Sequence, residues 1–596
     1  MSPIRYAIHP SRPEAHLFEV RCTVPMPDPD GQRFFLPVWI PGSYMIREFA
    51  RHIVSIRAEA GGRAVALDKL DKHTWRAAAV PAALTLIYEV YAWDLSVRAA
   101  HLDQTHGFFN GTSVFFAVEG KMGSPCLVDI QPPVTCGQNW RVATTLPRAK
   151  GEPGAAQPWG FGLYRAADYF ELIDHPVEMG VFTLDHFEAG GVRHSIVLTG
   201  RHDCDTARLR SDLARVCQWQ IDLFGAPPPM KHYLFLTQVV DEGYGGLEHR
   251  ASTALITRRD NLPYPGMKKI SDGYMAYLGL CSHEYFHLWN VKRIRPAAFD
   301  PCDLTRENHT RLLWAFEGIT SYYDDLALVR SGVIGTGDYL GLLEKSISSV
   351  LKTPGRTLQS VGQSSFDAWT HFYRQDENSP NAIVSYYAKG ALIALALDLR
   401  LRLESAGARS LDDVMRALWR QYGLTGEGVP EEGVFDRVAE IGGSAMARWL
   451  RKAVEETNDL PLAKWLKPFG VRCRIEAGSA TPSLGIKLNE GKAARIATAS
   501  DGGPAQKAGL SAGDVLIAVD GLRVESDSLP KILERRRAGE RIEIHAFRRD
   551  ELMRFELELA PAPLDTAKLS LETKPDKATK ALRDGWLGNA GVEGKC

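Results

Sequence analysis

The sequence lacks the features that mark membrane, secreted and disulfide-stabilised proteins. No apolar run approaches the roughly 18 residues that a membrane-spanning helix needs. Residues 1–6 have no apolar stretch after their charge, so no secretory signal is predicted. The 9 cysteines in 596 residues form no C-x-x-C pair, which favours reduced thiols in a reducing compartment. We therefore expect a cytoplasmic protein.

An excess of charge of either sign is also missing. The chain has 71 Lys and Arg against 72 Asp and Glu, for a formal net charge of -1. This balance gives no reason to expect nucleic acid or a membrane as a partner. Internal repeats and long low-complexity tracts are absent. The apolar fraction of 45% is that of a globular protein, and 596 residues suggest three or four domains.

The first part of the chain has the alternating pattern of β-strands. Phe18, Val20, Cys22 and Val24 fall on one face of an extended segment. Proline and glycine punctuate the strands that follow. The pattern predicts an all-β, sandwich-like domain over residues 1–170.

The pattern changes at about residue 171 to that of a mostly helical α+β domain, which we place at 171–470. Strands at 194–200 and 231–240 are expected around a helix at 205–224. Further helices are expected at 272–294, 306–330, 337–351, 384–404, 410–421, 431–440 and 443–456.

A linker and a small β-rich unit together occupy residues 471–562. The unit contains Leu484-Gly485-Ile486 and the pattern G-P-A-x-x-A-G-L-x-x-G-D at 503–514. The final stretch, 563–596, reads as a Lys-rich tail with one helix at 577–586. The whole chain is therefore predicted to be a multidomain α+β protein.

One motif within the expected helix 272–294 indicates chemistry. Residues 283–287 read H-E-x-x-H, and histidines four apart lie on one face of a helix, where both can reach one metal ion. Glu284, beside the first histidine, is then placed to take a proton from a metal-bound water.

A catalytic zinc ion needs a third protein ligand, and Glu317 is the candidate. It is a carboxylate in an otherwise apolar helical stretch, where a cation or hydrogen-bond donors are needed to offset its burial. The alternative is an ordinary glutamate on a helix surface. Asp324, seven residues later on the same helical face, is a candidate to hold a ligand imidazole in its tautomer, or else is solvated.

Several segments, in order along the chain, resemble one known family. They are LPVWIPGSYMIREFARHI at 36–53, GYGGLEHRAST at 243–253, HEYFHLWNVKRIRP at 283–296 and LWAFEGITSYY at 313–323. Together they resemble the glycyl aminopeptidase family of PDZ-containing zinc metallopeptidases, which are gluzincins. The resemblance covers nearly the whole chain and implies a thermolysin-like catalytic domain, a C-terminal PDZ domain and one Zn²⁺ per chain.

The resemblance assigns roles around the metal. It implies that His283, His287 and Glu317 hold zinc and that Glu284 is the general base, which then passes the proton to the leaving amine. Cobalt or manganese can replace zinc at such sites in vitro.

The resemblance also assigns residues that bind substrate. Glu248 matches the glutamate that related aminopeptidases carry in G-x-M-E-N, which binds the free α-ammonium of the peptide. Gly245 and Gly246 precede it in the motif that lines the substrate. This sequence has Leu247 and His249 where those enzymes have Met and Asn, so the local geometry is expected to differ. The alternative for Glu248 is a turn glutamate paired with a neighbouring basic residue.

A tyrosine completes the site that the resemblance implies. Related aminopeptidases carry a tyrosine two residues before Lys-Gly, whose hydroxyl stabilises the oxyanion. Alignment on Lys389-Gly390 selects Tyr387. Tyr386 is the alternative donor, and a core aromatic at the start of a helix is the structural alternative.

These assignments predict a zinc aminopeptidase that removes small N-terminal residues, Gly or Ala, from peptides with a free N-terminus. The alternative is a zinc endopeptidase or quality-control protease that recruits substrates through its PDZ domain. A catalytically dead scaffold is disfavoured because every expected ligand and the base are present. The PDZ domain either binds a peptide C-terminus or only packs, and the sequence does not indicate an oligomeric state.

Overall fold

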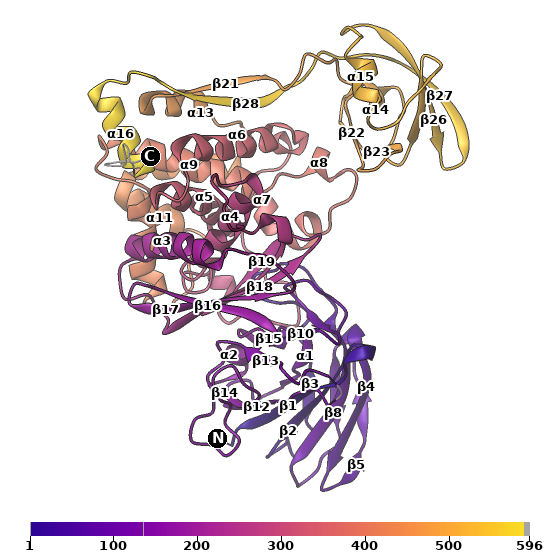
Figure 1. Ribbon diagram of the computed structural model, residues 1–596, viewed down its shortest axis with the longest axis vertical. Helices are drawn as coiled ribbons and strands as arrows, with labels where there is room; N and C mark the ends of the chain where they lie inside the picture. The colour runs from indigo at the N-terminus through magenta and orange to yellow at the C-terminus, as the bar shows by residue number, and fades with distance from the viewer. Residues whose placement is uncertain (1, 135, 589–596) are drawn as a thin grey trace. The chain divides into compact units, whose positions relative to one another are not determined.

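The computed structural model describes residues 2–134 and 136–588, and the chain divides into two compact units. The first contains the chain up to Asn308, Tyr323–Ile334 and Arg416–Pro430. The second contains His309–Tyr322, Gly335–Met415 and the chain from Glu431. Figure 1 shows the elements of both. Within the described ranges, no helix is long and apolar enough to cross a membrane.

The first unit begins with the predicted all-β domain. Its main sheet has seven strands in the order β14-β12-β1-β2-β8-β4-β5. These are β1 (Ile4–Arg12), β2 (Leu17–Val24), β4 (Ile53–Ala60), β5 (Arg63–Val65), β8 (Leu84–Tyr91), β12 (Cys126–Ile130) and β14 (Gly162–Ala166). Alternate residues of β2 are buried as predicted, with Val20 and Cys22 fully enclosed.

Two smaller sheets complete this domain. One has the order β13-β15-β10-β9 and the other β11-β3-β7-β6. Their strands are β3 (Arg33–Phe35), β6 (Leu67–Lys69), β7 (Thr74–Ala77), β9 (Ala100–Leu102), β10 (His106–Phe109), β11 (Ala117–Val118), β13 (Arg141–Ala143) and β15 (Val177–Gly180).

The α+β part of the first unit contains a five-stranded sheet in the order β16-β17-β18-β20-β19. Its strands are β16 (Phe182–Ala189), β17 (Val192–Thr199), β18 (His232–Val240), β19 (Gly245–Glu248) and β20 (Ser252–Arg258). β17, β18 and β20 are parallel, whereas β19 runs antiparallel at one edge. Helix α3 (Thr206–Phe224) is close to its predicted bounds. Asp205 caps its N-terminus, where the Asp205 side chain accepts a hydrogen bond from Arg208 N.

Helix α4 (Asp272–Phe286) packs against this sheet and carries the H-E-x-x-H motif. The prediction that it runs to 294 was wrong. Val291 has φ 117°, which a helix does not allow, and its N–H donates to the carbonyl of Ile294 at 3.0 Å. Leu288, Trp289 and Ile294 are fully buried in this loop. The apolar run therefore reflected burial and not helix.

The helix predicted at 306–330 also begins later than expected. Asn308 Nδ2 donates to the carbonyls of Asp303 and Arg306, at 2.8 and 2.9 Å, which closes a loop where the helix was expected. A π-helix, Trp314–Gly318, is followed directly by α5 (Ile319–Arg330).

The other predicted helices are present as α6 (Thr336–Leu351), α9 (Ala388–Glu404), α10 (Leu411–Leu418), α11 (Gly433–Gly442) and α12 (Ser444–Glu455). The short helices α7 (Val361–Phe366), α8 (Ser379–Ala382) and α13 (Leu462–Leu466) were not predicted. In the second unit, α9 packs closely on the π-helix. A Cβ atom on Gly318 would lie 2.6 Å from the Cα atom of Gly390, so glycine is needed at this crossing.

The predicted PDZ-like unit has its own sheet and apolar core inside the second unit. It comprises β22 (Ile486–Leu488), β23 (Ala494–Ala499), β24 (Val515–Val519), β25 (Leu522–Arg523), β26 (Arg541–Arg548), β27 (Glu551–Glu558), α14 (Pro504–Lys507) and α15 (Leu529–Leu533). Asn381 of α8 makes two hydrogen bonds to the backbone of this PDZ-like region. Its Nδ2 donates to Ala499 O and its Oδ1 accepts from Asp501 N, both at 2.9 Å.

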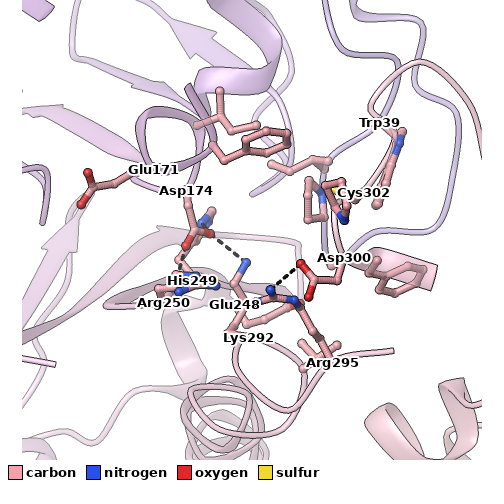
Figure 2. A pocket seen from close by; sticks show the side chains of 18 of the residues that line it. Trp39, Glu171, Asp174, Glu248, His249, Arg250, Lys292, Arg295, Asp300 and Cys302 are labelled. Carbon is pink, nitrogen blue, oxygen red and sulfur yellow. Dashed lines mark hydrogen bonds and ion pairs between the residues drawn. The ribbon is translucent and has the colours of Figure 1, made fainter. Parts of the chain in front are cut away.

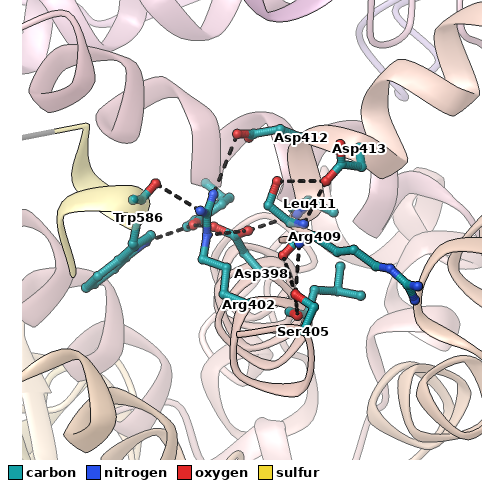
Figure 3. A network of polar contacts seen from close by, with 12 residues as sticks. Asp398, Arg402, Ser405, Arg409, Leu411, Asp412, Asp413 and Trp586 are labelled. Atoms are coloured by element: carbon teal, nitrogen blue, oxygen red, sulfur yellow. Dashed lines mark hydrogen bonds and ion pairs between the residues drawn. The ribbon is translucent and has the colours of Figure 1, made fainter. Parts of the chain in front are cut away.

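Residues 564–587 of the predicted tail contain a strand and a helix. β28 (Leu564–Leu571) pairs with β21 (Val471–Ala477), and α16 (Lys577–Leu587) is the predicted helix. Figure 3 shows its anchor, the fully buried Trp586, whose Nε1 donates to Tyr322 Oη at 3.0 Å. Tyr322 in turn donates to Asp398, which also pairs with Arg402 at 3.1 Å.

We predict that Trp586→Ala lowers the free energy of unfolding of the second unit by about 3–5 kcal/mol, because it opens a cavity and breaks the bond to Tyr322. Urea unfolding measures the change. The matched control is Lys580→Ala on the exposed side of α16, expected to cost under about 0.5 kcal/mol. Equal midpoints for the two variants would show that α16 contributes little to stability.

Candidate metal centre and active site

The two histidines of the motif turn their rings toward each other at the end of α4. Their Nε2 atoms are 3.1 Å apart. His287 Nδ1 lies 2.7 Å from the carbonyl oxygen of Asn290, which can only accept, so this Nδ1 carries the proton. His283 Nδ1 lies 3.0 Å from Asp324 Oδ2 and donates in the same way. Both Nε2 lone pairs therefore converge on one point.

This geometry fits a metal ion. Two nitrogens bound to one tetrahedral zinc at about 2.0–2.1 Å lie about 3.3 Å apart. An imidazole that binds a metal through one nitrogen usually donates a hydrogen bond from the other nitrogen to an oxygen acceptor. The predicted contact of Asp324 with a ligand imidazole is present, and Ser282 Oγ donates to the Asp324 carbonyl at 2.8 Å, which ties α5 to α4.

Glu284 is buried directly under the edge strand β19. A Cβ atom built on Gly246 would overlap Glu284 Oε1. Gly246 is therefore needed so that the strand can approach the carboxylate. Ligand atoms of Glu284, Glu248 and His287, all buried, lie within 4.8 Å of one another. β19 thus brings a second carboxylate to the motif.

Glu248 ends β19 and is 3% exposed. It is a strand residue, not the turn residue of the alternative interpretation. Gly42, with φ +102°, packs on its carboxylate: a Cβ atom there would lie 2.5 Å from Oε1. In the part of the chain that the structure describes, Oε1 accepts no hydrogen bond. A buried carboxylate oxygen without a donor is costly, so the site suits a cationic group that a ligand brings.

His249 does not pair with Glu248. Its Nδ1 lies 3.2 Å from Asp174 Oδ1, which also accepts from Lys292 Nζ at 2.7 Å. Burial by itself would raise the pKa of Asp174, but the Lys292 ammonium, followed by His249, holds that pKa well below its usual range. The residue in place of the expected Asn therefore anchors the end of β19 to the β domain.

A cavity of about 540 Å³ opens beside Glu248 within the first unit. Figure 2 shows Glu248, the Asp174–Lys292 pair and the Arg295–Asp300 pair (2.6 Å) around it. Its apolar wall consists of Trp39, Tyr44, Phe170 and Phe299. The charged side chains of both pairs are already matched. The cavity combines an apolar wall with the buried Glu248 carboxylate, whose Oε1 has no donor among the described residues.

The second unit holds the other two predicted site residues. Glu317 is 2% exposed in the π-helix, which excludes the surface-glutamate interpretation. Tyr387 immediately precedes α9, and its hydroxyl lies 2.9 Å from that of Tyr373. Tyr387 is partly exposed, whereas Tyr386 is fully buried.

Sequence reasoning did not single out Gly42, Asp174 or the Asn290 carbonyl as parts of the site. Gly42 lies inside the segment 36–53, which carried only the family resemblance. Its contact with Glu248 joins residues far apart in the chain, and no local pattern indicates such a contact. Asp174 is a single carboxylate near the end of a short helix, with no motif around it.

We predict that Asp324→Asn weakens zinc binding by about 10- to 100-fold, because the amide no longer holds the His283 imidazole as a charged acceptor does. Competition with a chromophoric chelator measures the affinity. Glu188→Gln, which removes an exposed carboxylate on β16, is the control and should bind zinc as the unaltered protein does. Equal affinity of both variants would contradict a role of Asp324 in the metal site.

Comparisons with known proteins identify the family of the chain. Family models match as Peptidase M61 N-terminal domain at residues 5–181, M61 glycyl aminopeptidase at 276–393 and PDZ domain at 495–542. A solved aminopeptidase N family protein from Idiomarina loihiensis is 42% identical, with TM-score 0.93, covering 98% of this chain and 100% of that one. No curated protein matches the chain.

More distant solved structures include an M1 zinc metallopeptidase from Deinococcus radiodurans, 14% identical with TM-score 0.47, covering 77% of this chain and 95% of that one. A variant of that enzyme bound to a Tyr-Ser-Ala substrate is 15% identical, with TM-score 0.47 and the same coverage. The extensive match to the Idiomarina protein and the two M61 models are decisive. The chain belongs to the M61 glycyl aminopeptidase family, and it is a zinc metallopeptidase.

Proposed function

We propose that this enzyme removes N-terminal residues, preferably Gly and Ala, from peptides with a free N-terminus. The observation that carries the proposal is the buried carboxylate of Glu248, which lies beside Glu284 and His287 and has an oxygen without a hydrogen-bond donor among the described residues. An α-ammonium group supplies both the charge and the donors that this oxygen needs.

We propose His283, His287 and Glu317 as the ligands of one zinc ion per chain. Support comes from the converging Nε2 atoms and from the burial of Glu317 in an apolar segment. Two neutral imidazoles and one carboxylate leave one position open for water or substrate, as catalytic zinc sites require. Metal analysis tests this: a zinc-free protein that retains full activity would contradict it.

The chain's own groups then perform proton transfer and positioning. Zinc held by these ligands would supply the Lewis acidity that polarises the scissile carbonyl and acidifies the attacking water. Glu284 accepts the proton of that water and passes it to the leaving amine. Its burial beneath Gly246 keeps the carboxylate fixed for both transfers.

Tyr387 is the proposed donor to the oxyanion. Its partial exposure and the 2.9 Å contact of its hydroxyl with Tyr373 favour it over the fully buried Tyr386. The contact orients the hydroxyl, while Gly318 and Gly390 hold the start of α9 against the π-helix.

The preference for small N-terminal residues is proposed from family membership. The cavity beside Glu248, with about 540 Å³, is where the first side chain of the peptide would lie. This volume exceeds what Gly or Ala needs. A rate profile over Gly, Ala, Leu and Phe anilides decides whether the preference holds.

The alternative is an endopeptidase or quality-control protease that recruits substrates through its PDZ domain. Gly485, with φ +71°, forms a tight turn before β22, which is the type of backbone that captures a peptide carboxylate. Buried Glu248 favours the aminopeptidase, because an internal peptide segment offers it no cation. The domain boundaries at 170, 470 and 562 and the cytoplasmic location remain predictions.

We predict that alanine anilide is cleaved at least about 100-fold faster than its N-acetylated form, because acetylation removes the charge that Glu248 binds. Glu248→Gln should lower kcat/KM for the free substrate by about 100-fold and remove most of this difference. Steady-state kinetics on both substrates measure the effect. Cleavage of the acetylated substrate at an equal rate would favour the endopeptidase.

We predict that Gly246→Ala lowers kcat at least about 100-fold, because the new methyl group displaces the Glu284 carboxylate from its position under β19. Zinc content should stay unchanged, which separates this effect from loss of the metal. Gly123→Ala is the control, since a Cβ atom there has no heavy atom within 4 Å. A fully active Gly246→Ala variant would show that the strand does not set the position of the base.

A further inference from the structure

An arginine from the β domain lies along the edge strand β19. Arg98 Nη2 donates to the carbonyl of Gly246 at 3.1 Å. Its Nη1 is the atom nearest to where a Cβ on Gly245 would be, at 3.5 Å. The guanidinium group therefore spans the two glycines that precede Leu247 and Glu248.

The positive charge of Arg98 is not matched by a carboxylate. It forms no ion pair within the described ranges 2–134 and 136–588, and its buried Nε has no hydrogen-bond partner there. By contrast, Arg295 near the cavity is paired with Asp300 at 2.6 Å. A half-buried guanidinium group with unused N–H donors is a binding site for an anion. A carboxylate can accept two parallel hydrogen bonds from its planar pair of N–H groups.

The spacing along β19 defines the length of peptide that would reach Arg98. A strand rises about 3.4 Å per residue, so Gly246 and Gly245 lie about 7 and 10 Å from Glu248. An extended dipeptide spans about 7 Å and a tripeptide about 10 Å. With the α-ammonium at Glu248, the terminal carboxylate of either peptide arrives at the Arg98 guanidinium. The Glu284 carboxylate has an oxygen within 4.8 Å of one from Glu248, so it faces the peptide close to the N-terminal end.

We propose that Arg98 binds the C-terminal carboxylate of di- and tripeptides, which makes the enzyme selective for short peptides with both termini free. This inference rests on the proposed role of Glu248 in binding the N-terminal ammonium. Arg98 is a specificity-determining residue, because it holds the end of the substrate that does not react. The bond to Gly246 uses one of the two N–H groups of Nη2, which leaves Nη1 and the other Nη2 N–H for the carboxylate.

The test compares Ala-Ala, Ala-Ala-amide and alanine anilide with the full-length zinc enzyme. In the unaltered enzyme, amidation should lower kcat/KM at least about 10-fold, mainly through KM, since the contact is made equally in the ground and transition states. Arg98→Gln, which retains a donor for Gly246, should remove this difference. Alanine anilide has no carboxylate, so Arg98→Gln should change its kcat/KM less than about threefold.

A second variant and a control keep the test decisive. Arg98→Lys retains the charge without the fork and should keep part of the preference for the free carboxylate. Arg57→Gln removes an exposed arginine from β4 of the same domain and should leave all three rates unchanged.

Two outcomes would overturn the proposal. One is an unaltered enzyme that cleaves the amide as fast as the acid. The other is an equal loss on all three substrates in Arg98→Gln, which would make Arg98 a structural clamp on β19. Failure of the proposed function is distinguishable, because it appears as equal cleavage of free and N-acetylated alanine anilide.

Discussion

Two imidazole lone pairs that face each other at 3.1 Å repel unless a cation lies between them. The Asn290 carbonyl and the Asp324 carboxylate create this situation, because each accepts the Nδ1 proton of one ring. The end of α4 at Phe286 contributes to this geometry. The loop that follows the helix turns back and places the Asn290 carbonyl next to His287 Nδ1. The early end of the helix thus sets the positions of the two imidazoles.

The edge strand β19 brings the other half of the site to this centre. Gly246 allows the strand to lie on Glu284, and Gly42 allows the β domain to pack on Glu248. Two carboxylates are therefore buried within 4.8 Å of His287, at a cost in desolvation that bound cations would offset. Arg98 extends the same strand with a positive charge, so opposite charges flank the place where a peptide would lie.

Sequence patterns predicted the kinds of elements better than their ends. Alternation in β2 and the helical period of α3 correspond to faces that are buried, so these elements were recognised. The segment after His287 is equally apolar but forms a loop. In such a short segment, a buried loop and a buried helix have the same apolar composition, so the sequence pattern could not distinguish them. Residues 563–596 were predicted to be a Lys-rich, partly polar tail with one helix. The composition did not indicate that Trp586 in this helix is fully buried and anchors α16.

The sequence by itself determined the family and the chemistry, since the H-E-x-x-H spacing is a local property of one helix and the other motifs follow in a fixed order. Only the tertiary structure decided which distant groups serve that chemistry. Gly42 on Glu248, Asp174 on His249 and Arg98 on Gly246 join segments that are about 75 to 200 residues apart. Such contacts depend on how the β domain packs against the sheet, and no local spacing records that packing.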